Sequence, residues 1–461
     1  MKLLVFGIAL ISGLANAQGV YQTDFPPEEF KARWQKLIAK IGDQAVAVVQ
    51  GVPLTNGFQM PRQSNEFYYL CGVETPHSYL LVDGRNGKVT LYLPPRNTRL
   101  EASEGKVLSA DDAELAKRLT GADEVLSTDE IRGDWFGKLA GGAPRTIYTL
   151  FSPAEGTSQS RGEIVSANAS IAADYWDGRL PREAHFANLI RARNPRSVVL
   201  DLTQAVDELR SVKSPREIAL IRRASVLAGE GILAAMKLTR QGVYEYQLDA
   251  AARHHYLMNG ARLEGYRSIA ASGTANINNA HYYRNTRQMD SGDLVLFDYA
   301  PDFHYYTSDI ARMWPVNGKF NPVQKELLQF VLEYRNAVLQ LLKPGVTPKQ
   351  ILDEARKAME PVLARTKFSK PIYEQGARRM VETGGGVLSH PVGMTVHDDG
   401  PYGPGPLKPG HVFSIDPQLW VREESLYIRY EDVVVITESG YENFTAFLPS
   451  ELSDLEKQVK P

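Results

Sequence analysis

The sequence predicts a mixed α/β fold divided into two domains. Its 461 residues are more than one hydrophobic core usually supports. Short apolar runs alternate with amphipathic helical stretches in the first half, and the second half contains two segments that read as paired strands. The formal net charge is −2, and Lys and Arg are scattered rather than gathered into a basic stripe, so we expect no nucleic-acid partner.

The N-terminal segment MKLLVFGIALISGLANA has the pattern of a secretory signal. Lys2 gives a positive start, residues 3–14 are apolar, and Ala15-Asn16-Ala17 is a small-x-small cleavage site. The apolar run is short for a membrane span, which argues against an anchor. We therefore expect cleavage of the signal peptide, residues 1–17, and a periplasmic or secreted protein that is not held in a membrane.

The first domain is expected to begin with a helix over PPEEFKARWQKLIAKI, because Pro-Pro-Glu-Glu is a typical helix start. The runs QAVAVVQG, FYYLCGV, SYLLVDG and KVTLYLPP are predicted as strands, and DAELAKRLT as a further helix. Cys71, in the second of these runs, is the single cysteine, so no intramolecular disulfide can form and we expect a buried thiol.

A long helical pattern over residues 201–240 leads into the second domain. Pro215 indicates a helix start, and Ile218, Ile221 and Ala224 recur at helical spacing. The predicted organisation is therefore a signal peptide over residues 1–17, a first domain over 18–205 and a second domain over 206–455.

The first paired segment is GDLVLFDYAPDFHYYTSDIARMWPV. Residues 294–297 and 310–316 read as strands, with Pro301-Asp302 as turn residues. A turn centred on residues 303–304 would place Asp298 opposite Asp309 on one face of the hairpin.

The second segment is HVFSIDPQLWVREESLYIRYEDVVVIT. A hairpin centred on its polar tip, residues 422–425, would place Asp416 opposite Glu431. Directly opposed side chains lie only ~4.5–5.5 Å apart, and like charges there repel. Two such acidic pairs within apolar strands favour a cation between them, because carboxylates are hard oxygen ligands for divalent metals. Surface acids in each hairpin are the alternative.

Histidines near these hairpins are candidate ligands. The stretch ETGGGVLSHPVGMTVHDDGPYG contains His390 and His397, and His281 lies in NNAHYYRN before the first hairpin. A neutral imidazole beside carboxylates favours Mn, Zn, Co or Fe over calcium. His254 and His255 fall in a helical stretch, and we interpret them as structural.

Taken together, these motifs resemble the metallopeptidase family of aminopeptidase P, prolidase and methionine aminopeptidase. RQSNEFYYLCGVETPHSYLLVD is similar to the N-terminal domain of aminopeptidase P and prolidase. SPREIALIRRAS, GARLEGYRSIAASG, HYYRN, GDLVLFDYA, SDIAR, SHPVGMTVHD and RYEDVVVIT follow in family order. The resemblance implies an α/β N-terminal domain of the creatinase and prolidase type, followed by a pita-bread catalytic domain.

The resemblance also implies the site residues. Two divalent metals, with Mn2+ favoured and Co2+ or Zn2+ as alternatives, would be held by Asp298, Asp309, His390, Asp416 and Glu431. His281 and His397 would be catalytic and substrate-binding, Asp416 would be catalytic as well as a ligand, and Arg429 would bind substrate.

The implied activity is metal-assisted hydrolysis of the Xaa-Pro bond at the N-terminus of peptides, with a metal-bridged water made hydroxide-like for attack on the carbonyl before proline. The implied substrates are peptides with proline in second position. A homodimer or a higher oligomer is a further expectation from the family.

Two positions depart from the family pattern. Asp416 stands where relatives usually carry glutamate before proline, so its side chain is one methylene shorter. Gly386 stands where aminopeptidase P and prolidase usually have a histidine four residues before the ligand histidine. The alternatives to an aminopeptidase P-like enzyme are therefore an Xaa-Pro dipeptidase, a metal-free C–N hydrolase of the creatinase type, and a catalytically impaired homologue that acts as a binding protein.

Overall fold

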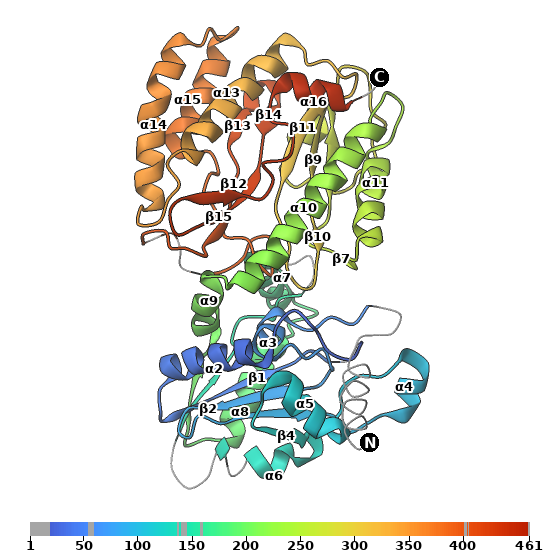
Figure 1. Cartoon of the computed structure of the whole chain (residues 1–461), viewed down its shortest axis with the longest axis vertical. Coiled ribbons are helices and arrows are strands. Elements are labelled where there is room, and N and C mark those ends of the chain that lie inside the picture. The colour runs from blue at the N-terminus through green and yellow to red at the C-terminus, as the bar shows by residue number, and fades with distance from the viewer. Residues whose placement is uncertain are drawn as a thin grey trace, which may run out of the picture. The chain divides into compact units, whose positions relative to one another are not determined.

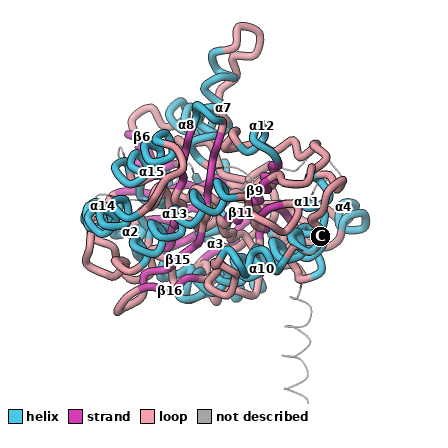
Figure 2. Tube along the Cα trace, turned by 90° about the horizontal axis from the view of Figure 1, so that it is seen from above, coloured by secondary structure: helices cyan, strands magenta, loops and turns pink. Residues whose placement is uncertain are grey.

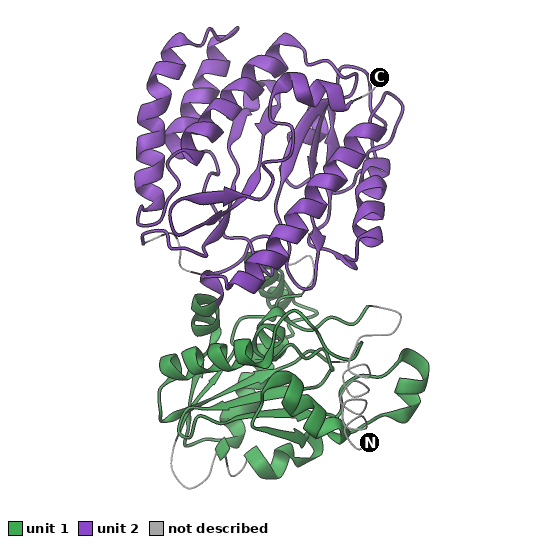
Figure 3. Cartoon of the chain, in the orientation of Figure 1, with its two compact units in different colours: residues 1–156, 161–209 green, residues 157–160, 210–461 purple. Residues whose placement is uncertain are grey.

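The computed structural model describes residues 19–53, 60–135, 138–139, 145–156, 160–400, 403 and 405–459. The predicted signal peptide, residues 1–17, lies outside the described residues. The chain forms two compact units, residues 1–156 with 161–209 and residues 157–160 with 210–461 (Figure 3). Within the described ranges, no helix is both long enough and apolar enough to cross a bilayer.

The first unit is built on one six-stranded mixed sheet in the order β4-β3-β2-β1-β5-β6 (Figure 1). Strand β1 pairs antiparallel with β2 and parallel with β5. The predicted strands at 45–50, 79–83 and 89–93 are confirmed. The strands are β1 (Ala45–Gln50), β2 (Tyr79–Asp83), β3 (Val89–Leu93), β4 (Glu124–Ser127), β5 (Thr146–Thr149) and β6 (Val198–Asp201).

Helices pack around this sheet, and the core between them includes Val46, Tyr92, Ile147 and Phe186. The predicted helices over PPEEFKARWQKLIAKI and DAELAKRLT are confirmed as α2 and α5. The helices are α2 (Pro27–Ile41), α3 (Asn65–Cys71), α4 (Thr98–Glu104), α5 (Ala113–Thr120), α6 (Ile131–Trp135), α7 (Arg161–Ala173), α8 (Arg182–Arg193) and α9 (Thr203–Ser211).

The run FYYLCGV is helical, so the predicted strand there is wrong. It lies in α3, where the Ser64 hydroxyl accepts a hydrogen bond from the Phe67 N–H and Gly72 ends the helix with φ +66°. Every residue of this helix is buried, so it shows no amphipathic pattern, and a short apolar run of this kind reads equally well as a strand. Cys71 is fully buried as expected.

The second unit places several small sheets between two groups of helices. Figures 1 and 2 show α10 and α11 on one side of the strands and α13, α14 and α15 on the other. The helices are α10 (Pro215–Leu238), α11 (Glu245–Met258), α12 (Gly273–Ile277), α13 (Pro322–Leu339), α14 (Pro348–Arg365), α15 (Pro371–Thr383) and α16 (Leu452–Gln458). Pro215 begins α10, as predicted, and Ser214 caps it.

The strands of this unit form sheets in the orders β11-β9-β8 and β12-β15-β16, with the pairs β13-β14 and β10-β7 beside them. They are β7 (Leu263–Glu264), β8 (Ile269–Ser272), β9 (Leu294–Asp298), β10 (Pro301–Asp302), β11 (Ala311–Pro315), β12 (Val412–Ile415), β13 (Gln418–Val421), β14 (Leu426–Arg429), β15 (Asp432–Ile436) and β16 (Tyr441–Asn443).

The predicted register is correct for the second hairpin and wrong for the first. Ile415 pairs with Asp432 and Gln418 with Arg429, so the same register on both sides places Asp416 opposite Glu431. In the first hairpin Asp298 pairs with Ala311, two residues beyond the predicted partner. The intervening loop contains β10, which pairs with β7, and left-handed residues His304 and Tyr305, so it is not a simple turn.

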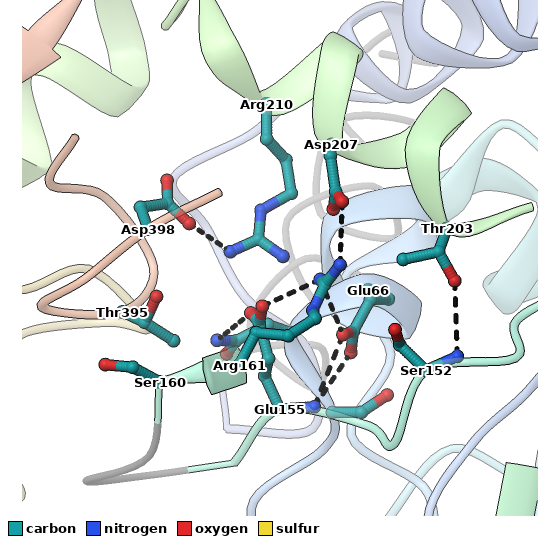
Figure 4. Close-up of polar contacts among 12 residues, drawn as sticks. Glu66, Ser152, Glu155, Ser160, Arg161, Thr203, Asp207, Arg210, Thr395 and Asp398 are labelled. Carbon is teal, nitrogen blue, oxygen red and sulfur yellow. Dashed lines mark hydrogen bonds and ion pairs between the residues drawn. The ribbon is translucent and has the colours of Figure 1, made fainter. Parts of the chain in front are cut away.

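A buried ion cluster lies in the second unit. Asp398 accepts a hydrogen bond from Arg210 (Figure 4) and lies 2.9 Å from Lys213 Nζ. Burial alone would raise the pKa of Asp398, but the charges of Arg210 and Lys213 outweigh it and hold that pKa below its usual range.

The first unit has a buried ion cluster of its own. Figure 4 shows Arg161 of this unit, which donates to Glu155 and Asp207, each at 2.7 Å.

We expect Asp398→Asn to lower the free energy of unfolding by about 3–5 kcal/mol at neutral pH, because it leaves two buried cations without their carboxylate. Because the pKa of Asp398 is lowered in the folded state, its ionised form stabilises the fold at pH values above the unfolded-state pKa of about 4. This stabilisation is lost as the pH falls through the folded-state pKa. Urea unfolding of wild type and variant should therefore converge in acid. Asp353→Asn, which removes a surface ion pair with Lys349, is the control and should change little. Equal stability of both proteins at neutral pH would contradict this account.

Candidate metal centre

Four buried carboxylates converge in the second unit. Asp298, Asp309, Asp416 and Glu431 are each at most 2% exposed. Asp298 ends β9, Asp309 precedes β11, and Asp416 and Glu431 lie between the paired ends of β12-β15 and β13-β14. Oxygens of Asp298, Asp309 and Glu431 lie within 4.8 Å of one another, as do ligand atoms of Asp309, His390 and His397. These residues therefore offer two adjoining sets of metal-ligand atoms.

Arg429 lies among the carboxylates and holds three of them. Its guanidinium donates from Nε to Asp416 Oδ1 at 2.6 Å, from Nη1 to Asp298 Oδ2 at 2.6 Å and from Nη2 to Glu431 Oε2 at 2.7 Å. Arg429 and Glu431 share a strand face, as their spacing of two predicts. Burial would lower the pKa of Arg429, but these three charges raise it well above its usual range, so the guanidinium is positively charged.

One guanidinium does not neutralise four buried carboxylates. Burial, followed by the charge of Asp298, raises the pKa of Asp309 well above its usual range, and burial does the same to the pKa of Glu431. Asp309 Oδ2 is buried, and no hydrogen-bond donor contacts it among the described residues. An uncompensated carboxylate is costly in such a place, so the cluster needs further positive charge. A divalent cation fits both this deficit and the oxygen-rich donor set.

His390 presents one ring nitrogen to this cluster. Its Nδ1 lies 3.2 Å from the Pro391 carbonyl, which can only accept, and in the tautomer that donates to this carbonyl the Nε2 atom has a lone pair for a metal. His390 Nε2 lies 3.5 Å from Asp309 Oδ2. Burial lowers the pKa of His390 to about 3, with a smaller effect of His397, so the imidazole is neutral and suited to metal binding.

The two other candidate histidines lie near His390. The rings of His390 and His397 have centroids 4.2 Å apart, and the centroids of His397 and His281 are 6.4 Å apart. His281 is exposed, whereas His390 is mostly buried. His397 is thus in contact with the mostly buried His390 beside the carboxylates and close to the exposed His281.

Hydrogen bonds from neighbouring elements fix the carboxylates in place. The Tyr266 hydroxyl donates to Asp298 Oδ1 at 2.6 Å and the Ser414 hydroxyl donates to Glu431 Oε1 at 2.6 Å. The Glu431 N–H donates to the Ala311 carbonyl at 3.0 Å, which ties the last predicted ligand to the sheet of β9 and β11. Such supporting contacts orient metal ligands and raise their affinity.

Glu245 organises the segment that carries His281. It begins α11, is fully buried, and its carboxylate accepts five hydrogen bonds of 2.6–2.9 Å. The donors are the Ser272 N–H and hydroxyl, the Asn276 amide, the Tyr282 hydroxyl and the Arg287 N–H. One of them, Tyr282, is the neighbour of His281, so this carboxylate holds the segment that carries His281.

The structure brings together all five predicted ligands, both histidines and Arg429, although Asp416 joins the others through Arg429 rather than directly. Sequence reasoning missed Tyr266, Glu245 and Gln418. Gln418 follows Asp416 by two residues, so strand periodicity alone places it on the same face. Nothing local in the sequence connects Tyr266 or Glu245 with residues so far along the chain.

Comparison with known proteins gives matches over most of the chain. The model for metallopeptidase family M24 matches residues 219–438, and the model for the N-terminal domain of aminopeptidase P matches residues 30–148. Xaa-Pro aminopeptidase 3 from Mus musculus is 30% identical over 417 residues, covering 86% of this chain and 76% of its own. Xaa-Pro aminopeptidase from Escherichia coli K12 is 29% identical over 451 residues, covering 93% and 97%.

Solved structures agree with these matches. Aminopeptidase P from E. coli with the inhibitor Pro-Leu has a TM-score of 0.74 at 26% identity, covering 95% of this chain and 98% of its own. The Zn-substituted E. coli enzyme in complex with product gives the same values. The predicted fold, an aminopeptidase P-type N-terminal domain followed by a pita-bread domain, is confirmed.

Proposed function

Because this chain belongs to metallopeptidase family M24, we propose that it removes the first residue from peptides with proline in second position. The observation that carries this proposal is the convergence of four buried carboxylates and a neutral imidazole on a region short of positive charge. Relatives named Xaa-Pro aminopeptidase, together with a likeness to aminopeptidase P, support the substrate class.

The proposed cofactor is a pair of divalent metals, with Mn2+ favoured over Co2+ and Zn2+. Asp298, Asp309, His390, Asp416 and Glu431 would hold them, and the buried, unsatisfied oxygen of Asp309 is consistent with this role. A bound metal of this kind lowers the pKa of a coordinated water and polarises a substrate carbonyl.

The protein's own residues would orient the peptide around that centre. His397, whose ring neighbours those of His390 and His281, would donate a hydrogen bond near the scissile carbonyl. His281 would contact the peptide at the entrance. Each nitrogen of the Arg429 guanidinium donates to a carboxylate, so Arg429 would bind substrate after a metal takes over some of those contacts.

The proposal predicts Mn2+-dependent release of the first residue from a peptide of the form Xaa-Pro-Xaa-Xaa. Chromatography of the products measures this release. A matched peptide with alanine in second position is the control substrate, and EDTA should abolish release. Cleavage of Xaa-Pro dipeptides alone would indicate a dipeptidase instead. Metal binding without hydrolysis of any Xaa-Pro peptide would support the impaired homologue, and absence of both would overturn the proposal.

A second set of expectations concerns where and how the protein works. We propose that it is exported after loss of residues 1–17 and that it assembles as a homodimer or higher oligomer. The support is the N-terminal pattern for export and the family resemblance for assembly. Mass measurement of the mature protein, with light scattering on the same sample, tests both.

A further inference from the structure

Both oxygens of the Asp416 carboxylate are held by neighbouring donors. Oδ1 accepts from Arg429 Nε at 2.6 Å, and Oδ2 accepts a hydrogen bond from the side-chain amide of Gln418. The Asp416 side chain is only 2% exposed, so these donors, rather than water, determine how its carboxylate is turned. Arg429 also binds two further carboxylates, whereas the amide of Gln418 is a dedicated contact of Asp416 in this cluster.

The two donors are directly opposed residues of one strand pair. Gln418 and Arg429 are Cα partners in the β13-β14 register, so their side chains rise from the same face, next to Asp416 and Glu431. The Asp416 carboxylate therefore accepts hydrogen bonds from both members of the Gln418–Arg429 pair. This is the first residue pair of the β13-β14 ladder after the gap that separates it from the β12-β15 ladder. The χ2 torsion, which turns an aspartate carboxylate, has only a broad preference of its own, so the two donors determine its orientation here.

Gly386 leaves the room that the Gln418 amide occupies. A Cβ atom at Gly386 would lie 2.9 Å from the Asp416 carbonyl oxygen and 3.0 Å from Gln418 Nε2, both too close for ordinary contact. The backbone there has φ +89°, a conformation that favours glycine. The Gln418 N–H also donates to the Gly385 carbonyl at 2.8 Å, so the glycine loop and Gln418 fit each other.

Gln418 lies between the proposed metal centre and a cavity. A cavity of about 190 Å³ is lined by Gly385, Gly386, Gln418 and Trp420 together with residues of α15. The Gln418 side chain is only partly buried, and its amide reaches from this cavity to Asp416. It contacts a proposed ligand without belonging to the ligand set itself.

We propose that Gln418 is a positioning residue that fixes the orientation of the Asp416 carboxylate and so sets the affinity of the metal position that Asp416 serves. This inference rests on the proposed metal centre. Residues that support a ligand in this way typically contribute about 10–100-fold in metal affinity. Asp416, Gln418 and Gly386 then depend on one another. The absence of a side chain at Gly386 leaves room for the Gln418 amide, and that amide orients the Asp416 carboxylate.

The test is a Co2+ titration of the metal-free full-length protein, followed by visible absorption, with metal content measured after dialysis. We expect Gln418→Ala and Gln418→Asn to weaken cobalt binding by about tenfold or more, since neither side chain reaches Asp416. Gln375→Ala, an exposed glutamine on neighbouring α15, should bind like wild type. Thermal unfolding of each apoprotein separates a binding defect from a folding defect.

A double-mutant cycle then links the effect to Asp416. In an Asp416→Glu background the carboxylate is moved by one methylene, so the loss caused by Gln418→Ala should shrink to about twofold or less. Undiminished cobalt affinity in Gln418→Ala, an equal loss in Gln375→Ala, or a full loss in the Asp416→Glu background would each overturn the inference. Failure of the wild type to bind cobalt would instead overturn the metal centre on which it rests.

Discussion

Asp309→Asn is expected to abolish metal binding and to reduce Xaa-Pro hydrolysis by about a thousandfold or more, because a metal centre supplies several kcal/mol of transition-state stabilisation. The same change should leave the metal-free protein at least as stable as the wild type. Burial already raises the pKa of Asp309 well above its usual range, so a neutral amide suits this position better than a carboxylate when no metal is present.

Metal content after dialysis, hydrolysis rate and urea unfolding in EDTA measure these three quantities separately. Asp290→Asn is the matched control, since Asp290 is exposed and lies three residues from its ion-pair partner Arg287. Retention of both metal and activity in Asp309→Asn would contradict the ligand role. A marked loss of apoprotein stability would contradict the electrostatic account of the site.

Arg429→Met, in contrast to Asp309→Asn, is expected to destabilise the metal-free protein. Removing the guanidinium leaves Asp298, Asp416 and Glu431 without their shared partner, which should cost the metal-free protein about 3–5 kcal/mol. Saturating Mn2+ should recover much of this loss, because a cation that binds the folded state stabilises it and can neutralise the same carboxylates.

Urea unfolding of wild type and Arg429→Met, each in EDTA and in Mn2+, gives the four values needed. Arg378→Met, which removes an exposed ion pair with Glu374, should lose little in either condition. If the Arg429→Met protein is equally destabilised with and without Mn2+, the guanidinium and the metal do not share their partners, and this interpretation is wrong.

The contrast between the two hairpins shows what the sequence could predict about the site. The register around Asp416 and Glu431 was predictable because apolar residues flank one short polar tip on both sides. The loop after Asp298 instead forms β10, which pairs with residues 263–264, and this distant pairing is invisible in a local pattern. Asp298 and Asp309 still converge, because Asp309 lies only two residues before Ala311, the first residue of β11, which pairs with Asp298.

The central position of Arg429 could not be predicted in the same way. Its spacing from Glu431 fixes a shared face, but not which carboxylates the guanidinium meets. Those contacts depend on Asp298, which lies 131 residues earlier in the chain. The error at α3 has a simpler cause. Ser64 and Gly72 are residues typical of a helix start and a helix end, but the apolar run between them favoured the prediction of a strand.

The hydrogen bond from the Glu431 N–H to the Ala311 carbonyl joins two sheets at the point where the ladders of β12-β15 and β13-β14 are interrupted. Neither sheet can open there without breaking a contact of the other. We therefore expect the backbone around these carboxylates to open cooperatively, with amide protons that exchange with solvent more slowly than those of exposed loops. The positions of the carboxylates are thus set by folding, and a binding cation would still have to take over some of the contacts that Arg429 makes with them.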